Sequence, residues 1–114
     1  MHENIEVIES GYEFLLAYAA QGRESDEGSD TRATLSGMSD AADTIVATLG
    51  DADGEFSSVV VDDARKAGAA IRLVLGQDKI SSELVDNLNA SIHLRALLTD
   101  LFLLSETSDA DKRS

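Results

Sequence analysis

The acidic stretch Asp51–Asp62 (DADGEFSSVVVD) contains the residue types that hold calcium in other proteins. It begins D-x-D, and a calcium loop of the EF-hand type spaces oxygen ligands over twelve residues. Three positions break the pattern. Phe56 replaces the sharp-turn glycine, Val59 supplies no side-chain oxygen, and Asp62 is shorter than the bidentate glutamate that ends such a loop. We therefore expect an ordinary turn between two helices, without calcium.

Carboxylates on two predicted helices offer a second kind of metal site. Helical bundles hold iron or manganese between facing Glu and His side chains, and the usual signature is Glu-x-x-His. The sequence has two histidines, His2 and His93, and neither follows a glutamate at that spacing. Without ligand pairing, buried carboxylates are too costly to expect. We predict a solvated acidic surface here, with no metal and no cofactor.

The alternative function is a metal- or cofactor-binding bundle that uses inward carboxylates. The acids that could line two facing helices are Glu6, Glu9, Glu13, Asp40 and Asp43. Glu9, Glu13 and Asp43 are the members that we would expect to carry such a site.

No set of residues has the makeup of a catalytic centre. Cysteine is absent, which removes thiolate nucleophiles and Cys-ligated metal clusters. There is no G-x-S-x-G elbow, and no glycine-rich loop has the spacing of a phosphate or dinucleotide site. His93 has no orienting partner that we can name for general-base work. We predict no catalytic residue, and the composition favours a protein that is not an enzyme.

Three basic residues on one predicted helix, Arg65, Lys66 and Arg72, form a local concentration of positive charge. Arg65 and Arg72 are seven residues apart and therefore lie near one helix face. In a chain of net charge -13, this cluster is a candidate anion-binding or docking patch. The alternative is pairing with acids on adjacent helices, or with Asp62 and Asp63 nearby, and each such pair contributes little at a surface.

The segment 94–104 (LRALLTDLFLL) is apolar on more sides than the single face that a helix buries in a bundle. We expect the excess surface to contact a second copy or another protein, because a small domain gains core by pairing identical patches. The candidate interface residues are Leu97, Leu98, Leu101, Phe102 and Leu104.

Four stretches with helical spacing must position these groups. Apolar residues recur every three or four positions over 3–21, 31–49, 55–75 and 79–105. Stretches rich in Gly, Asp and Ser separate the four segments, and proline is absent. Four helices with short connections predict an all-α, antiparallel up-down-up-down four-helix bundle.

One domain should contain all of these helices, because 114 residues support a single core. We assign residues 1–105 to this domain. The stretch 22–30 (GRESDEGSD) has no apolar residue and is expected to be a mobile acidic loop. The polar segment 106–114 is expected to be a flexible tail.

The net charge of -13 repels phosphate backbones and anionic lipid, so we expect neither nucleic acid nor a membrane as a partner. The N-terminus lacks the positive region of a secretory signal, and no apolar run approaches the roughly 20 residues that cross a bilayer. We expect a cytoplasmic location. The sequence thus predicts a small acidic, non-enzymatic helical protein that forms a homodimer and acts through protein–protein interaction, as an adaptor or regulator.

Overall fold

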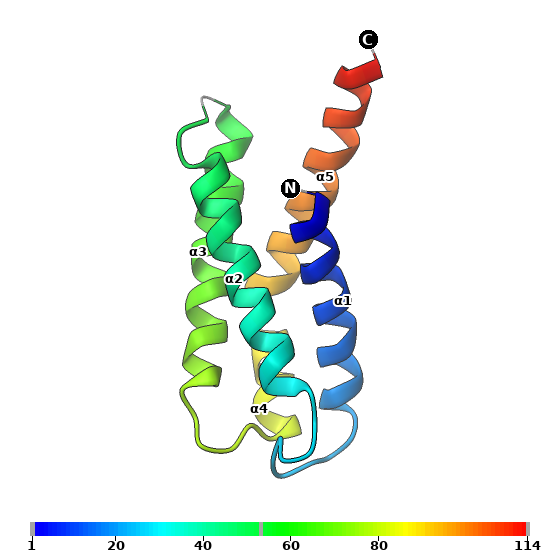
Figure 1. The fold of residues 1–114 in the computed structure, drawn as a ribbon, viewed down its shortest axis with the longest axis vertical. Coiled ribbons are helices and arrows are strands. Elements are labelled where there is room, and N and C mark those ends of the chain that lie inside the picture. The colour runs from blue at the N-terminus through cyan, green and yellow to red at the C-terminus, as the bar shows by residue number, and fades with distance from the viewer. Residues whose placement is uncertain (1, 53, 114) are drawn as a thin grey trace.

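The computed structural model describes residues 2–52 and 54–113, with side chains described as far as Thr107. Over these residues the chain is all-α, as predicted (Figure 1). None of the described helices is long and apolar enough to cross a membrane. The five helices are α1 (His2–Ala19), α2 (Thr31–Leu49), α3 (Glu55–Leu75), α4 (Ser82–Ala90) and α5 (His93–Arg113).

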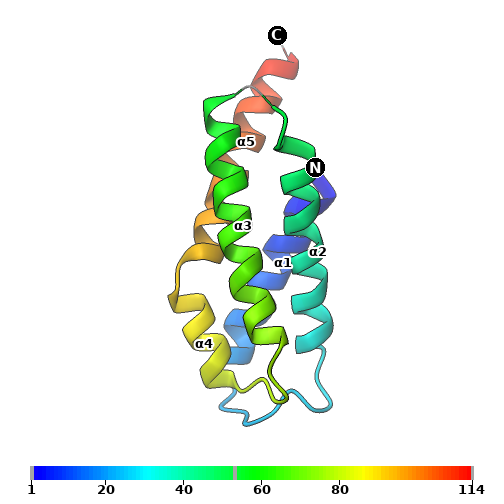
Figure 2. The ribbon, with the colours of Figure 1, turned by 90° about the vertical axis from the view of Figure 1, so that its left-hand side faces the viewer.

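The helices form an elongated molecule of 50 × 23 × 20 Å. α2 packs between α1 and α3, while α4 and α5 follow one another along the side that α1 and α3 leave open (Figures 1 and 2). α1 and α3 run towards the end of the molecule that holds α4, and α2 and α5 run back from it (Figure 1). The start of α1 and the end of α5 therefore both lie away from the end that holds α4 (Figure 1).

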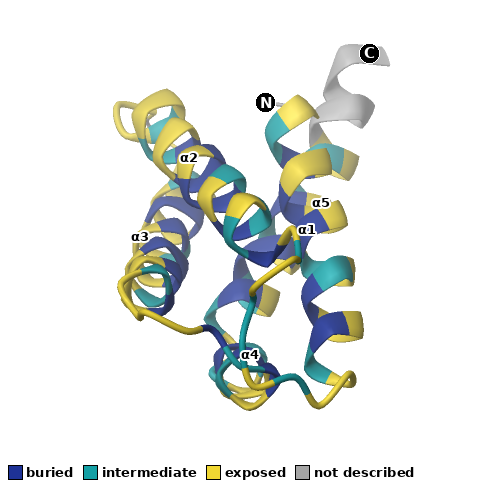
Figure 3. Cartoon of the chain, turned by 60° about the horizontal axis from the view of Figure 1, so that its bottom comes forward, coloured by how far each residue is buried: buried dark blue, intermediate teal, exposed yellow. Residues whose placement is uncertain are grey.

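An aliphatic core holds the helices together, and the buried residues face the interior of the bundle (Figure 3). In α2, the apolar residues Leu35, Met38, Ala42 and Ile45 alternate steps of three and four, and all four are buried. Tyr18 is the aromatic residue of this core, at 1% exposure. Burial of a side chain of this size stabilises the fold by roughly 1.5–3 kcal/mol.

The predicted fourth helix, 79–105, is wrong in one respect: it is two helices, so the fold is not a strict four-helix bundle. Helix α4 begins after Ser81, whose hydroxyl accepts from the Leu84 amide at 3.0 Å. It ends at Ala90, and Ile92 then has a left-handed backbone with φ of 65°. The chain turns there and re-enters a helix, because the Ala96 amide donates to the Ile92 carbonyl at 2.8 Å.

Two further segments were assigned from composition alone. The loop 22–30, expected to be mobile, makes several hydrogen bonds to other parts of the molecule, which are described below. The segment 106–114, expected to be a flexible tail, begins inside α5, whose backbone continues to Arg113. Ser114 lies outside the described residues. Mobility of both segments stays a prediction.

Candidate functional site

The predicted interface on the last helix is largely core. Leu97 and Leu101 are fully buried and Leu98 is 8% exposed, so a partner cannot reach these three without opening the bundle. Leu104 is partly buried against the same core. Phe102, at 40% exposure, is the member of the set with substantial free surface. The assignment of the three leucines to an interface is corrected: α5 packs against both α3 and α1, so its core face is wide.

Other large apolar side chains are exposed on α3 and α5. Among the described residues, eight large hydrophobic side chains are exposed, and six belong to these two helices or to the residue just before α5. Only two lie elsewhere in that part of the chain, both on α1. The six are Phe56, Val59, Leu73, Ile92, Phe102 and Leu103.

Two of these residues, Ile92 and Leu103, share one face of α5 with Ala96 and Thr99, and we call these four residues the outer α5 stripe. Its spacing of four, three and four residues places the four side chains on one helix face. Ile92 is 63% exposed and Leu103 is 50% exposed. A shallow, mainly apolar hollow of about 370 Å³ lies along it, bordered by Arg95 and Asp100. The core does not use this face of α5.

The three predicted cations, Arg65, Lys66 and Arg72, have different surroundings. Arg72 pairs with Asp43 of α2 at 3.3 Å, and both side chains are well exposed. Arg65 borders a polar hollow at the α2–α3 turn together with Asp62, whereas Lys66 and Arg72 do not line it. The exposed pair of Arg72 and Asp43 contributes about 0–1 kcal/mol to the stability of the fold. Arg72 is engaged with a carboxylate as the alternative interpretation expected, and an anion site built from all three cations stays a prediction without support from this arrangement.

The carboxylates of the alternative metal site point outward. Glu9, Glu13 and Asp43 are all exposed, so they are not the inward ligands that such a bundle needs. Among the residues that the structure describes, no three His, Asp or Glu side chains gather closely enough to hold a metal ion. The candidate calcium segment is not a loop along its length, because α3 already begins at Glu55.

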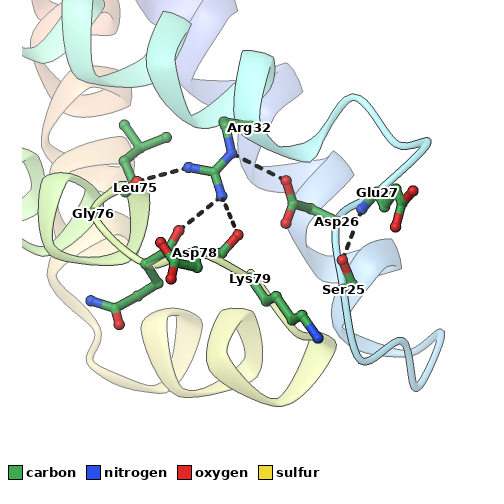
Figure 4. Close-up of a pocket in the computed structure, with 9 residues that line it drawn as sticks. Ser25, Asp26, Glu27, Arg32, Leu75, Gly76, Asp78 and Lys79 are labelled. Atoms are coloured by element: carbon green, nitrogen blue, oxygen red, sulfur yellow. Dashed lines mark hydrogen bonds and ion pairs between the residues drawn. The ribbon is translucent and has the colours of Figure 1, made fainter.

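A polar network that sequence reasoning missed lies at the end of the bundle near α4 (Figure 4). The Arg32 guanidinium pairs with the Asp26 carboxylate at 3.2 Å and donates to the carbonyls of Leu75 at 2.8 Å and Gln77 at 2.9 Å. Because Leu75 is the last residue of α3, Arg32 satisfies carbonyls that a helix end leaves unpaired. The other Asp26 oxygen accepts from the Ile80 amide at 2.9 Å.

The network continues from the loop after α1 into the start of α4. Ser82 and Arg23 exchange two hydrogen bonds, one from each backbone amide, both at 2.8 Å. The Ser82 hydroxyl donates to the Tyr18 carbonyl at 2.7 Å, and the Tyr18 hydroxyl donates to the Ile80 carbonyl at 2.6 Å. Together these bonds hold the end of α1 and the loop after it against the start of α4 and the segment before it, which are more than fifty residues away in sequence.

The hydrogen bond from the Ile80 amide, with a further contribution from Arg32, holds the pKa of Asp26 below its ordinary value of 3.8. The hollow around Arg32 is lined by residues that already bond to one another. The Arg32 guanidinium faces one carboxylate and several carbonyls. These contacts are those of a structural connection between loops, and they leave the guanidinium with few donors for a ligand.

A second unpredicted feature is a pair of acids between α3 and α5. Asp100 of α5 carries a buried oxygen, Oδ2, that has no hydrogen-bond partner in this structure. Burial, and then the neighbouring Asp63 carboxyl on α3, raise the pKa of Asp100 to about 7. In the sequence the two residues are 37 positions apart, and no periodic pattern distinguishes them from other surface acids.

Comparison with protein-family models, with curated proteins and with solved structures finds no match to this chain.

Proposed function

We propose that this protein is a small, acidic, non-enzymatic helical module that acts through protein–protein interaction as an adaptor or regulator, and that a second copy of the chain is its first partner. The observation that carries the proposal is the outer α5 stripe, where Ile92 and Leu103 are exposed and a mainly apolar hollow lies between helix residues of α5. Exposed apolar residues that follow one face of a helix in a small protein are typical of an interaction site. A cytoplasmic location and the absence of nucleic-acid partners belong to the same proposal.

The finer architecture in this proposal is an antiparallel up-down-up-down arrangement in which α4 and α5 together take the place of the fourth helix. α5 then presents one face to the core and leaves the opposite face to a partner. A helix that is apolar on two opposite faces buries one face in its own core and needs a second molecule to cover the other.

The charge distribution favours a second copy as the partner. α1 carries four glutamates and no Lys or Arg, whereas α3 carries three acidic and three basic residues. Between His93 and Thr107, α5 carries one basic and two acidic residues. Two molecules of charge -13 repel least when they meet through surfaces of low net charge, and α5 is less acidic than α1 over its described side chains.

A two-fold arrangement of two α5 helices is self-complementary. In an antiparallel pairing centred near Thr99, Ala96 of one copy faces Leu103 of the other, so a small side chain meets a large one. Arg95 approaches Glu106 of the other copy in the same pairing, which places opposite charges together. Isologous pairing of this kind repeats each contact twice.

The decisive variant is Leu103→Lys, with Leu16→Lys as the matched control. Leu103 is 50% exposed on α5 and Leu16 is 49% exposed on α1, so the two changes alter similar areas on different faces. In sedimentation velocity at tens of micromolar, we expect the wild type and Leu16→Lys to be dimers and Leu103→Lys to be a monomer. Circular dichroism should show the same helical content in all three. A monomeric wild type, or equal loss of the dimer in both variants, would contradict the proposal.

A further inference from the structure

The outer α5 stripe is in register with the buried face of α4, although a break separates the two helices. Val85 of α4 is fully buried, and Ile92 and Thr99 follow it at intervals of seven residues. Seven residues make about two helical turns, so these three side chains would share one face of an unbroken helix. The other two members of the stripe lie four residues after Ile92 and four residues after Thr99, on the same face. The stripe therefore lies where the core face of α4 would continue.

The residues of α5 that the core buries lie on the opposite face. Leu94 is nine residues after Val85, which is about two and a half helical turns, and Leu101 is about two turns further along. Leu94 is 1% exposed and Leu101 is fully buried. The break at Ser91 and Ile92 thus turns α5 by about half a turn relative to α4, so that the leucines meet the core and the stripe does not.

This break has costs that an unbroken helix avoids. Ile92 has a φ of 65°, which is unfavourable for a β-branched residue, and the segment 87–95 contains neither glycine nor proline. Among the described residues, the backbone amides of His93, Leu94 and Arg95 have no hydrogen-bond acceptor. The first turn of a helix leaves such amides unpaired, and in an unbroken helix they would donate to the carbonyls four residues earlier.

α4 is the fixed side of the break, whereas α5 is held by apolar packing. The Ser82 hydroxyl at the start of α4 accepts from the Arg23 amide at 2.8 Å and donates to the Tyr18 carbonyl at 2.7 Å. Over its described side chains, α5 makes hydrogen bonds only within itself, from Thr99 and from Thr107. Apolar contact is not directional, so α5 is able to pack through a different face.

We infer that the connection at Ser91 and Ile92 is a two-state hinge that decides which face of α5 meets the core. In the bent state described above, Ile92 is left-handed and the leucines of α5 fill the core. In the straight state, Ile92 is helical and α5 continues α4 along the same side of the molecule (Figures 1 and 2). The stripe then faces inward, and Leu94 and Leu101 face solvent. Leucine burial favours the bent state, while the relaxed Ile92 backbone and the added helical hydrogen bonds favour the straight state.

The hinge belongs to one chain and does not depend on the proposed dimer. Its consequence for association does rest on the proposed function, because the bent state exposes the stripe and the straight state withdraws it. A second copy that binds the stripe therefore holds α5 in the bent state.

Thiol labelling tests the hinge, since the chain has no cysteine of its own. Leu101→Cys on α5 and Leu35→Cys on α2 are matched variants, because both leucines are fully buried. In dilute protein, we expect Leu101→Cys to be labelled at least about tenfold faster than Leu35→Cys, with little dependence on urea, because the straight state opens α5 alone. Leu35→Cys should react only through global unfolding, and its rate should rise steeply with urea.

Substitutions at Arg95 separate the hinge from fraying of α5. Arg95 is exposed, and its amide lies in the first turn of α5, so Arg95→Pro is compatible with the bent state. In the straight helix, proline removes a hydrogen bond and clashes with the carbonyl four residues earlier. Arg95→Pro should therefore slow the labelling of Leu101→Cys to the urea-dependent rate of Leu35→Cys, whereas Arg95→Ala should keep the fast reaction. Equal labelling of the two cysteine variants, or a fast reaction that survives Arg95→Pro, would overturn the inference.

Ile92→Gly keeps the test decisive if Arg95→Pro folds poorly. Glycine relieves the left-handed conformation of the bent state and weakens the straight helix, so it should slow the labelling of Leu101→Cys roughly tenfold or more. An unchanged or faster reaction in Ile92→Gly would refute the hinge. All labelling is done at low protein concentration, so failure of the proposed dimer leaves these expectations unchanged.

Discussion

Arg32 joins three parts of the backbone: its own helix α2, the loop after α1 through Asp26, and the end of α3 through the Leu75 carbonyl. Loss of the guanidinium leaves one carboxylate and several carbonyls to find water instead. We predict that Arg32→Ala lowers the free energy of unfolding by about 1.5–3 kcal/mol, because hydrogen bonds to charged groups contribute in this range. Urea unfolding at neutral pH measures the change. Arg65→Ala, an exposed control, should change the free energy of unfolding by less than about 0.5 kcal/mol. Equal changes in the two variants would show that the Arg32 network does not stabilise the fold.

Ile92 has a left-handed backbone conformation, which is unfavourable for a β-branched side chain. A left-handed conformation costs an L-residue roughly 1–2 kcal/mol, and glycine avoids this cost. Ile92 is 63% exposed, so its side chain contributes little to the core. Ile92→Gly should therefore raise the free energy of unfolding by about 1 kcal/mol, measured by urea unfolding of dilute protein. Ser91→Gly should lower it, since Ser91 is right-handed and its hydroxyl donates to the Leu88 carbonyl. Destabilisation by Ile92→Gly would mean that the Ile92 side chain packs more than its exposure indicates.

At the scale of helices, two mid-helix glycines with the same propensity cost have different surroundings. A Cβ added at Gly11 of α1 would overlap the sulfur of the fully buried Met38 on α2, whereas a Cβ at Gly37 meets nothing within 4 Å. Gly11→Ala should lower the free energy of unfolding by about 1–3 kcal/mol through overpacking. Gly37→Ala should raise it by about 0.5–1 kcal/mol through helix propensity. Thermal unfolding of the two variants checks both signs, and a stabilising Gly11→Ala would disprove the close approach of α1 and α2.

Helical periodicity was sufficient to predict the first three helices. The predicted ranges 31–49 and 55–75 coincide with α2 and α3, and 3–21 is shifted from α1 by one or two residues. The fourth prediction missed the break because Ile80, Leu84, Leu88 and Ile92 keep a four-residue spacing across it. That spacing does not show that Ile80 precedes the helix or that Ile92 follows it with a left-handed turn. Polar residues before the break (Asn87, Asn89, Ser91) were the available signal for it.

The candidate site was less predictable than the helices, because it depends on which helices become neighbours. Sequence spacing identified α5 as having excess apolar surface, but it could not divide that surface between core and exterior. Leu97 and Leu101 became core because α3 and α1 both pack on α5, and Leu103 remained outside. The Arg32 network and the acid pair join residues far apart in sequence, so no local pattern reveals them.

For the whole molecule, the central claim is that the outer α5 stripe pairs two copies of the chain. The net charge of the molecule is distributed unequally: α1 is strongly acidic, whereas α3 has equal numbers of acidic and basic residues. Salt screens repulsion between the two acidic bodies and leaves apolar contact intact. Association should therefore strengthen as salt concentration rises.

Sedimentation equilibrium of the wild-type protein at low and high salt measures this association. We expect a species of twice the 12.1 kDa chain mass at tens of micromolar, with a lower dissociation constant at high salt. A mass of 12.1 kDa at every concentration and salt level would contradict it.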